Sequence, residues 1–325
     1  MRILSNITKQ REFMLLVIVI AIFVIMSFAS PIFLNADNML AVLLSLSLEG
    51  IIAVAMTMLL VAGGFDLSVG SVMALCAAVA AFLCKEVGLP VPLGMLLGVL
   101  AGACVGLFNG MIVTKIGINP FITTLSGLNL FRGLTYILLG GRNISGIPES
   151  YRILGQGYLF GIQFPIWYAI AIFIVGGILL KKSRFFRQNY YIGGNEKSAW
   201  LSGIKVNRVK MFTYFLTGLS AGFAGVVMSS RTASATTTIG SGVELRVITS
   251  VILGGASLSG GEGTIFGTFL GCMLMALVAN VINLTGVDVY WQTFVSGAIL
   301  LGAVIVDKIG KQRREKMAMI AEKGE

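Results

Sequence analysis

The sequence predicts an all-α membrane protein, a polytopic bundle of about ten transmembrane helices with broken-helix segments. Of its 325 residues, 56% are hydrophobic and only 12% are charged, and the mean hydropathy is +0.92. Soluble domains carry about 25% charged residues. The apolar residues form runs of at least about 17 residues, the length that a helix needs to cross a bilayer. No polar stretch is long enough for a soluble domain, so residues 1–325 are expected to form a single transmembrane domain.

Ten apolar runs are the predicted spans. The third is short and the eighth is interrupted by paired glycines, so counts from eight to eleven remain open. The first run follows basic residues as a signal peptide does, but its 21 residues exceed the 7–15-residue signal-peptide core, so we expect it to remain as a span. The runs cover residues 14–34, 39–62, 69–84, 91–114, 118–139, 162–180, 211–230, 243–261, 264–285 and 287–306.

Basic residues predict that both the N-terminus and the C-terminus are cytoplasmic. In that orientation, 18 of the 24 Lys and Arg residues fall in cytoplasmic segments, as the positive-inside rule requires. Most of them lie in loop 181–210 and in the basic tail 307–325. Charge placed there favours contact with anionic membrane lipid over binding of nucleic acid.

Residues 63–71, which read GGFDLSVGS, follow the second span. Each Gly costs a helix about 1 kcal/mol relative to Ala, and an ionised Asp at the bilayer centre costs roughly 2.5–3.5 kcal/mol. Irregular backbone persists at that depth only where protein or a water-filled cavity satisfies its polar groups. We therefore expect this segment to border a polar path, with Asp66, Ser68 and Ser71 as candidate path residues.

Other polar residues within the spans are functional candidates by default. Buried pairs or helix ends at the membrane surface are the structural alternatives, and a pair between Arg132 and Glu49 is one of them. Glu244 and Arg246 begin a span, where snorkelling to the interface is the favoured interpretation. The candidates added to the path are Glu49, Asn109, Arg132 and Asn280.

Glycines recur at every fourth residue along the fourth span and form one flat ridge on a helix. Such a ridge lets another helix approach closely. Packing within the chain is the favoured interpretation, and a seam between two copies is the alternative. The ridge consists of Gly94, Gly98, Gly102, Gly106 and Gly110.

Loop 181–210 carries eight basic residues and one acid. Its centre, residues 195–204, predicts a short helix that Asn195 caps and Gly203 ends. A rigid helix on a basic loop is typical of a docking site for a soluble partner, and contact with anionic lipid is the alternative. The candidate coupling residues are Gly194, Asn195, Glu196, Ser202 and Gly203.

Nothing in the sequence favours catalysis. The chain has no His, which excludes Ser/His and Cys/His nucleophilic sites. Its one Gly-Lys pair, at residues 310–311, lacks the flanking residues of a phosphate-binding loop. The four cysteines lie in or beside apolar runs, so a disulfide framework is not expected. We therefore predict a non-enzymatic protein with no cofactor and no metal site, driven by a separate subunit if it needs energy.

Four elements in the same order resemble the ribose-type permease subunit of ATP-binding-cassette sugar importers, within the branched-chain amino acid and sugar permease superfamily. They are GGFDLSVGS at 63–71, NPFITTL at 119–125 with FRG at 131–133, IGGNEKSAWLSGI at 192–204, and the glycine-rich run 244–271. Phe65, Ser198 and Arg246 depart from the family pattern. The likeness extends over nearly the whole chain.

This resemblance implies the translocation path for a monosaccharide in a bacterial inner membrane. It also implies a cytoplasmic ATP-binding subunit docked on residues 195–204, an extracytoplasmic sugar-binding protein, and a homodimer or a heterodimer with a sister permease. Two alternatives remain: a permease for branched-chain amino acids or nucleosides, and an ion-coupled carrier with Asp66 and Glu49 as coupling acids. The DLSVG element favours sugars and loop 181–210 favours an ATP-driven importer; which sugar is carried stays open.

Overall fold

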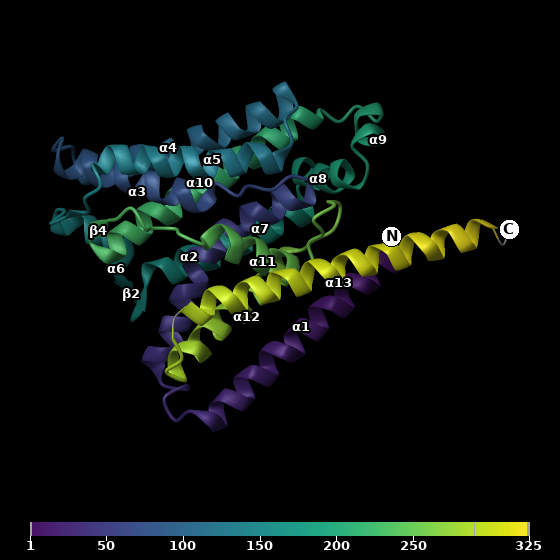
Figure 1. The fold of residues 1–325 in the computed structure, drawn as a ribbon, viewed down its shortest axis with the longest axis horizontal. Helices are drawn as coiled ribbons and strands as arrows, with labels where there is room; N and C mark the ends of the chain where they lie inside the picture. Colours follow the sequence, from purple (N-terminus) through teal and green to yellow (C-terminus); the bar gives the residue numbers. More distant parts are fainter. Residues whose placement is uncertain (1, 289, 324–325) are drawn as a thin grey trace.

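The computed structural model describes residues 2–288 and 290–323 and is almost entirely helical (Figure 1). Within these residues, eight helices are long and apolar enough to cross a membrane. They are α1 (Arg2–Ala29), α2 (Ala36–Val61), α4 (Val91–Met111, continued by a π-helix over Ile112–Ile116), α5 (Pro120–Leu139), α7 (Phe164–Lys182), α10 (Val206–Thr232), α12 (Ile265–Leu284) and α13 (Tyr290–Lys323). The all-α membrane fold is thereby confirmed.

The remaining two predicted spans contain shorter helices, namely α3 (Val69–Lys85), which is apolar, and α11 (Val243–Leu253). Every predicted span therefore contains a helix, but two boundaries were wrong. The predicted span 243–261 is helical only to Leu253, because the backbone turns at Gly254 and at Gly255, where φ is +93°. The predicted span 14–34 ends at Ala29, because the residue preceding Pro31 disfavours helical backbone.

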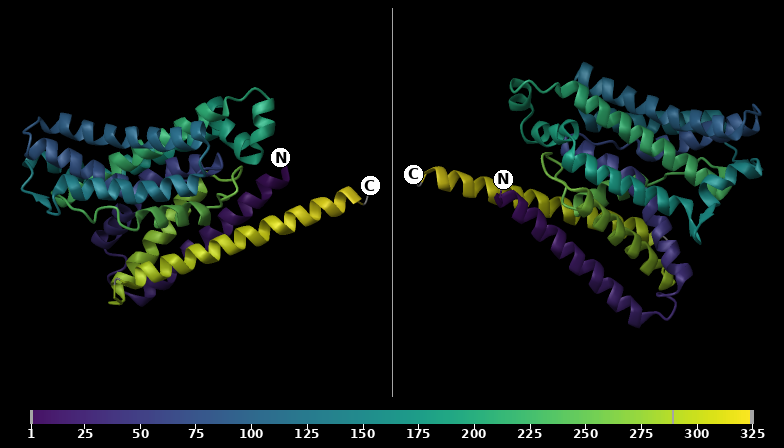
Figure 2. Two further views of the ribbon diagram at one scale, coloured as in Figure 1. Left: turned by 45° about the horizontal axis from the view of Figure 1, so that its top comes forward. Right: turned by 180° about the vertical axis from the view of Figure 1, so that it is seen from behind.

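The helices form successive layers (Figure 1). One layer holds α3, α4, α5 and α10, the next holds α2, α7 and α11, and α1, α12 and α13 lie on the far side. The first residues of α1 and the last of α13 lie at the same end of the molecule as α8 (Arg184–Gly194) and α9 (Glu196–Leu201) (Figures 1 and 2). The start of α1 and the end of α13 thus share a side with the predicted docking loop.

The glycine ridge of α4 packs within the chain. All five of its glycines are buried. A Cβ added to Gly102 would lie 2.5 Å from the carbonyl oxygen of Gly218 and 2.8 Å from the Cα of Gly222, both on α10. A Cβ added to Gly98 would lie 2.7 Å from the Cβ of Ala80 on α3. The intrachain interpretation of the ridge is confirmed, because α3 and α10 occupy the face that a second copy would need.

Short strands fix the connection that follows α10. Strand β1 (Ile144–Ser145) pairs antiparallel with β4 (Ser234–Ala235), and β2 (Tyr158–Leu159) pairs with β3 (Ile162–Gln163). Between these pairs lie a 3₁₀ turn (Glu149–Arg152) and α6 (Ile153–Gln156), which hydrogen-bond to the end of α10 through Ser229 and Ser230. The segment 233–242 is thereby held at the end of the bundle opposite α9 (Figure 1).

We expect Gly102→Ala to lower the thermal-unfolding midpoint of the detergent-solubilised protein. The added methyl group would overlap the backbone of α10, and overpacking of this kind costs about 1–3 kcal/mol. Gly133→Ala is the matched control, because Gly133 is also helical and an added Cβ would meet no atom within 4 Å. Since Ala favours helix over Gly, the control should keep or raise the midpoint. Equal midpoints for the two variants would contradict the intrachain packing.

Candidate functional site

A cavity of about 410 Å³ lies among α2, α3, α10, α11 and segment 233–242. Its volume is in the range typical of small-molecule sites. Six hydroxyl side chains line it, and three charged side chains, Glu49, Arg231 and Arg246, lie among them. We call it the hydroxyl-lined cavity. The hydroxyl groups belong to Ser45, Thr232, Ser234, Thr236, Thr238 and Ser241.

Most of these hydroxyl groups come from segment 233–242. The chain leaves α10 at Ala233, which has a positive φ of 51°, and then pairs with β1. It turns again at Gly240 and Gly242, where φ is +73° and +75°, and enters α11. Such φ values suit glycine, which has no Cβ to clash. The segment therefore returns toward the bundle interior and presents alternate side chains to the cavity.

Arg132 of α5 anchors this segment. Its guanidinium donates hydrogen bonds to the carbonyl oxygens of Thr237 and Ile239, at 2.7 and 2.8 Å. The suggested pair between Arg132 and Glu49 is wrong, because the guanidinium is bound to the backbone of segment 233–242 and Glu49 has another partner. Arg132 thus positions the cavity wall without lining it.

An ion pair lies at the cavity surface. The Nε of Arg246 donates to Oε1 of Glu49 at 2.5 Å, and both side chains are partly buried. Among the described residues, Arg246 forms its ion pair with Glu49 of α2 and none with Glu244 of its own helix. The pair offers a neutral surface with donors and acceptors side by side, which suits a ligand whose groups can both donate and accept hydrogen bonds.

The first turns of α3 and α11 meet beside this cavity. A Cβ on Gly70 would overlap both the carbonyl oxygen of Gly240 and Oε2 of Glu244. The carboxylate of Glu244 therefore lies inside the protein beside the start of α3, which replaces the predicted snorkelling position. Its Oε2 is buried and has no hydrogen-bond partner among the described residues. A carboxylate between two helix N-termini interacts favourably with both helix dipoles.

Asp66 and its neighbours form a separate, fully buried cluster. Oδ1 of Asp66 accepts hydrogen bonds from the backbone N–H and the hydroxyl of Ser68, at 2.7 and 2.6 Å. The amide of Asn109 donates to Oδ2 of Asp66 at 3.2 Å and to the Ser68 hydroxyl at 2.9 Å. Ser71 donates to the Ser68 carbonyl at 2.8 Å. The cluster fixes the turn that begins α3, two residues before Gly70.

The structure therefore divides the seven predicted path residues. Glu49 lines the cavity and Arg132 holds its wall. Asp66, Ser68, Ser71 and Asn109 are at most 1% exposed and do not line it. Asn280 exchanges hydrogen bonds with Asn38, at 2.6 and 3.2 Å, and joins α12 to α2.

Sequence reasoning missed the hydroxyl-rich run that lines the cavity. Residues 234–241 read SATTTIGS, a cluster of small hydroxyl side chains between two predicted spans. This local enrichment was the available signal. Ser and Thr are also ordinary loop residues, so composition alone does not separate a cavity wall from a connection.

The predicted docking helix is present as α9. The side chain of Asn195 caps it by accepting the N–H of Ser198 at 2.9 Å, and the backbone turns at Gly203, where φ is +84°. Glu196 pairs with Lys210 of α10 at 2.6 Å, and Ser202 and Gly194 flank the helix on the exposed side. Trp200 and Leu201 are 66% and 69% exposed. A short helix that presents two large apolar side chains beyond the bundle is suited to contact with another protein.

Three pairs of adjacent glycines, at residues 63–64, 193–194 and 260–261, meet at the end of α8. We call this contact the glycine junction. A Cβ on Gly193 would overlap the carbonyl oxygen of Val61 and the backbone nitrogen of Gly261. The N–H of Gly261 donates to that same Val61 oxygen at 2.9 Å. A Cβ on Gly260 would lie 2.8 Å from the Cα of Gly193 and 3.0 Å from that of Gly63. The end of α8, which leads into the docking helix α9, thus contacts the connection between α2 and Asp66.

Within residues 2–288 and 290–323, no group of three carboxylate or thiol side chains comes together as a metal site. The chemistry available at the hydroxyl-lined cavity is hydrogen bonding and charge.

We expect Asp66→Asn to keep most of the stability and Asp66→Leu to lose it. Asn retains an acceptor for Ser68, and the Asn109 amide, whose Oδ1 has no described partner, can rotate to accept the new N–H. Leu leaves the Ser68 groups unpaired, at about 1–3 kcal/mol for each buried group. Thermal unfolding of the solubilised protein is the measurement. Equal losses in both variants would mean that the negative charge itself is required.

The family model for the permease component of the branched-chain amino acid transport system matches residues 38–304. Over 287 residues the chain is 41% identical to the ribose import permease protein of Bacillus subtilis, covering 88% of this chain and 89% of that protein. The corresponding protein of Haemophilus influenzae is 38% identical over 303 residues, covering 92% and 93%. The L-arabinose ABC transporter permease protein of Azospirillum brasilense is 38% identical over 303 residues, covering 93% and 89%. The chain therefore belongs to the family of branched-chain amino acid transport system permease components.

Proposed function

We propose that this chain is the transmembrane permease subunit of an ATP-driven importer and forms the path for a monosaccharide across the bacterial inner membrane. The similarity to ribose and arabinose permeases over most of the chain supports this function. The structural observation that carries it is the hydroxyl-lined cavity, with its compensated pair of Glu49 and Arg246.

The chemistry of a monosaccharide matches that lining. A sugar is neutral, and each of its hydroxyl groups both donates and accepts hydrogen bonds. Six protein hydroxyl groups and the mutually neutralised pair of Glu49 and Arg246 offer such partners, and Arg231 adds a further hydrogen-bond donor. A branched-chain amino acid would instead bring one carboxylate, one ammonium group and an apolar side chain. Arg231 could receive the carboxylate, but the ammonium group would have to displace Arg246 from Glu49, the one carboxylate in the lining.

The position of the cavity fits delivery from an extracytoplasmic binding protein. The cavity lies beside β4, at the end of the bundle opposite α9 (Figure 1). If α9 faces the cytoplasm, as the distribution of basic residues predicts, the cavity faces outward. A sugar-binding protein docked on that face would release its ligand next to segment 233–242.

The energy would come from a separate ATP-binding subunit. We infer that this subunit docks on α9, where Trp200 and Leu201 are exposed. Gly194, Asn195, Glu196, Ser202 and Gly203 would shape that contact by capping and orienting the helix. A second copy of the chain or a sister permease would complete the transmembrane part.

The ion-coupled alternative is less well supported. Its two candidate coupling acids are Asp66 and Glu49. Asp66 is fully buried in a hydrogen-bonded cluster that fixes the backbone, and Glu49 is engaged by Arg246. A carboxylate that binds and releases an ion or a proton during transport would have to break these interactions in every cycle.

The function is tested by reconstituting the permease with its ATP-binding subunit and its binding protein in lipid vesicles. Uptake of labelled ribose, arabinose, a hexose, leucine and a nucleoside would be compared with and without ATP. We expect ATP-dependent uptake of at least one monosaccharide. Uptake of leucine or the nucleoside alone, or uptake driven by an ion gradient without ATP, would overturn the proposal.

Cysteine labelling tests the path itself. In a variant that lacks the four native cysteines, we expect Thr236→Cys and Ser241→Cys to react with a small water-soluble thiol reagent in the absence of ATP. The transported sugar, at about ten times its dissociation constant, should slow the reaction roughly tenfold by occupying the cavity. Ser71→Cys is the control, because Ser71 is 0% exposed and should stay unreactive in that state. Reactivity that sugar leaves unchanged at both cavity positions would exclude this cavity as the path.

We predict that a substitution which disturbs the glycine junction weakens the coupling between ATP hydrolysis and transport. Gly193→Ala should reduce the stimulation of ATP hydrolysis by sugar-loaded binding protein, because the methyl group would push α8 away from Val61 and Gly261. Gly133→Ala is the control, since Gly133 is also helical, lies outside the docking contact, and an added Cβ there meets no atom within 4 Å. We expect a loss of several-fold in stimulation for the first variant alone, in line with overpacking of about 1–3 kcal/mol. Matching stimulation ratios for the two variants would remove the junction from the coupling path.

A further inference from the structure

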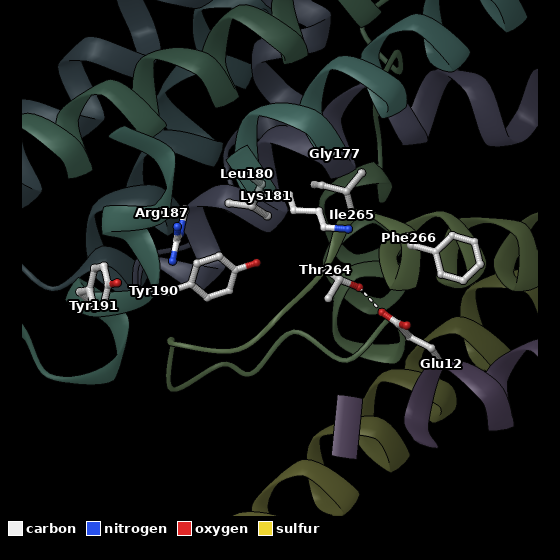
Figure 3. A pocket seen from close by; sticks show the side chains of 10 residues that line it. All are labelled: Glu12, Gly177, Leu180, Lys181, Arg187, Tyr190, Tyr191, Thr264, Ile265 and Phe266. Carbon is white, nitrogen blue, oxygen red and sulfur yellow. Dashed lines mark hydrogen bonds between the residues drawn. The ribbon is translucent and has the colours of Figure 1, made fainter. Parts of the chain in front are cut away.

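A second cavity, of about 940 Å³, lies where α7 ends, away from the hydroxyl-lined cavity (Figure 3). Its walls come from α1, α7, α8 and the start of α12. Figure 3 shows Lys181 and Tyr190 extending toward Thr264, with Glu12 approaching from α1. We call it the α7-end cavity.

An apolar groove of about 750 Å³ continues from this cavity along α7. The two spaces share four lining residues, Gly177, Lys181, Ile265 and Phe266. From there the groove follows one face of α7, between α2 and α12, as far as Ile162. It therefore runs along a helix long enough to cross the membrane, and its charged end coincides with the last turn of that helix.

The charges at that end are free to bind an anion. Lys181 and Arg187 both line the α7-end cavity, and neither forms an ion pair or a side-chain hydrogen bond with any described residue. The only carboxylate in the lining, that of Glu12, accepts a hydrogen bond from the hydroxyl of Thr264. Figure 3 shows Lys181 on the side of the cavity where Glu12 meets Thr264, and Arg187 on the other side of Tyr190, so the cavity has one unpaired cation on either side of this phenol.

Tyr190 closes the inner side of the cavity. Its hydroxyl donates to the carbonyl oxygen of Gly263 at 2.7 Å. Burial and the nearby carboxylate of Glu12 raise the pKa of Tyr190 to about 12. The phenol therefore stays protonated near neutral pH and adds no negative charge that would oppose an anion at Lys181 and Arg187.

The cavity, its two cations and the adjoining groove distinguish a binding site from ordinary surface charge. A Lys at the end of a spanning helix often reaches the lipid headgroups without forming a site. Here the Lys is joined by an Arg from another helix, a preformed cavity and an apolar groove that begins at the same residues. The arrangement of one polar end and one long apolar arm matches an amphiphile with an anionic headgroup.

We propose that the α7-end cavity and its groove bind one anionic glycerophospholipid, with its headgroup in the cavity between Lys181 and Arg187 and an acyl chain along α7. Arg and Lys are the side chains that bind phosphate most strongly, and basic pockets between spanning helices are suited to anionic headgroups. This site is distinct from the sugar path and does not depend on which sugar is carried. The bound lipid would join α1 to α7 and α8.

The position of the site suggests an effect on coupling. Gly263 and Thr264 close the loop that passes through the glycine junction at Gly260 and Gly261. A phosphate bound beside Thr264 would hold this loop and α8 together. Bound lipid would then stabilise the contacts at the glycine junction, which join α8 to the rest of the bundle.

Native mass spectrometry of the purified permease tests the proposal directly. Protein from nanodiscs with equal amounts of phosphatidylglycerol and phosphatidylcholine should retain one phosphatidylglycerol in preference. The double variant Lys181→Gln/Arg187→Gln should lower that retention roughly tenfold, because it removes both charge-assisted contacts. The matched control is Lys205→Gln/Arg208→Gln, which removes the same charge from exposed positions at the same end. Equal retention of the two lipids by wild-type protein, or equal losses in the two double variants, would overturn the site.

A steric variant tests the groove with the charges left in place. Gly177 lies where the two spaces meet, and a Cβ there would contact only Ile265, at 3.9 Å. Gly177→Leu should therefore fill the entrance to the groove while the protein keeps its unfolding midpoint. We expect it to reduce phosphatidylglycerol retention several-fold, whereas Gly133→Leu in open space on α5 should not. Undiminished retention in Gly177→Leu would overturn the placement of the acyl chain.

Discussion

Direct contact between backbones at glycine is the constraint on which this bundle depends. In a membrane, apolar side chains gain little by leaving lipid for protein, so helices associate through close packing and internal hydrogen bonds. The glycine ridge of α4 lets α10 approach closely. The backbone of Gly70 packs directly against Gly240, and that of Gly193 packs against Val61 and Gly261. The last two contacts set where α3 and α8 lie relative to the irregular segments, and so they determine the shape of the hydroxyl-lined cavity and of the glycine junction.

The elements that local sequence determines were predictable. Apolar runs indicated a helix in every predicted span, the spacing of glycine indicated the ridge, and Asn195 indicated the start of α9. The paired glycines within the eighth run indicated an interruption, but hydropathy alone did not place the end of α11 at Leu253. The loop that follows turns at glycines that pack against α8, 60 residues or more away in sequence. Such long-range contacts leave no periodic signal.

The candidate site was predictable only in its residue types. Glu49 and Arg132 stood out as charges within apolar runs, but their partners lie far away in sequence and had to come from the structure. Glu49 pairs with Arg246, and Arg132 binds the backbone of segment 233–242. Asp66 stood out for its irregular surroundings, and its hydrogen bonds to Ser68 explain why an acid is tolerated there. Its role in the structure is to hold a broken helix in position.

The start of α3 is the element that links the two ends of the molecule. At one end, Val61 and Gly63 lie against α8 and its loop partner at the glycine junction. Asp66 fixes the turn that follows. At the other end, Gly70 lies against Gly240 in the cavity wall. Close-packed interiors cannot absorb a displacement by compressing. If α8 moves with a docked subunit, either the contacts at Gly193 separate or residues 61–70 move with it. In the second case Gly240 must shift as well, and the hydroxyl-lined cavity changes shape without any change in the side chains that line it.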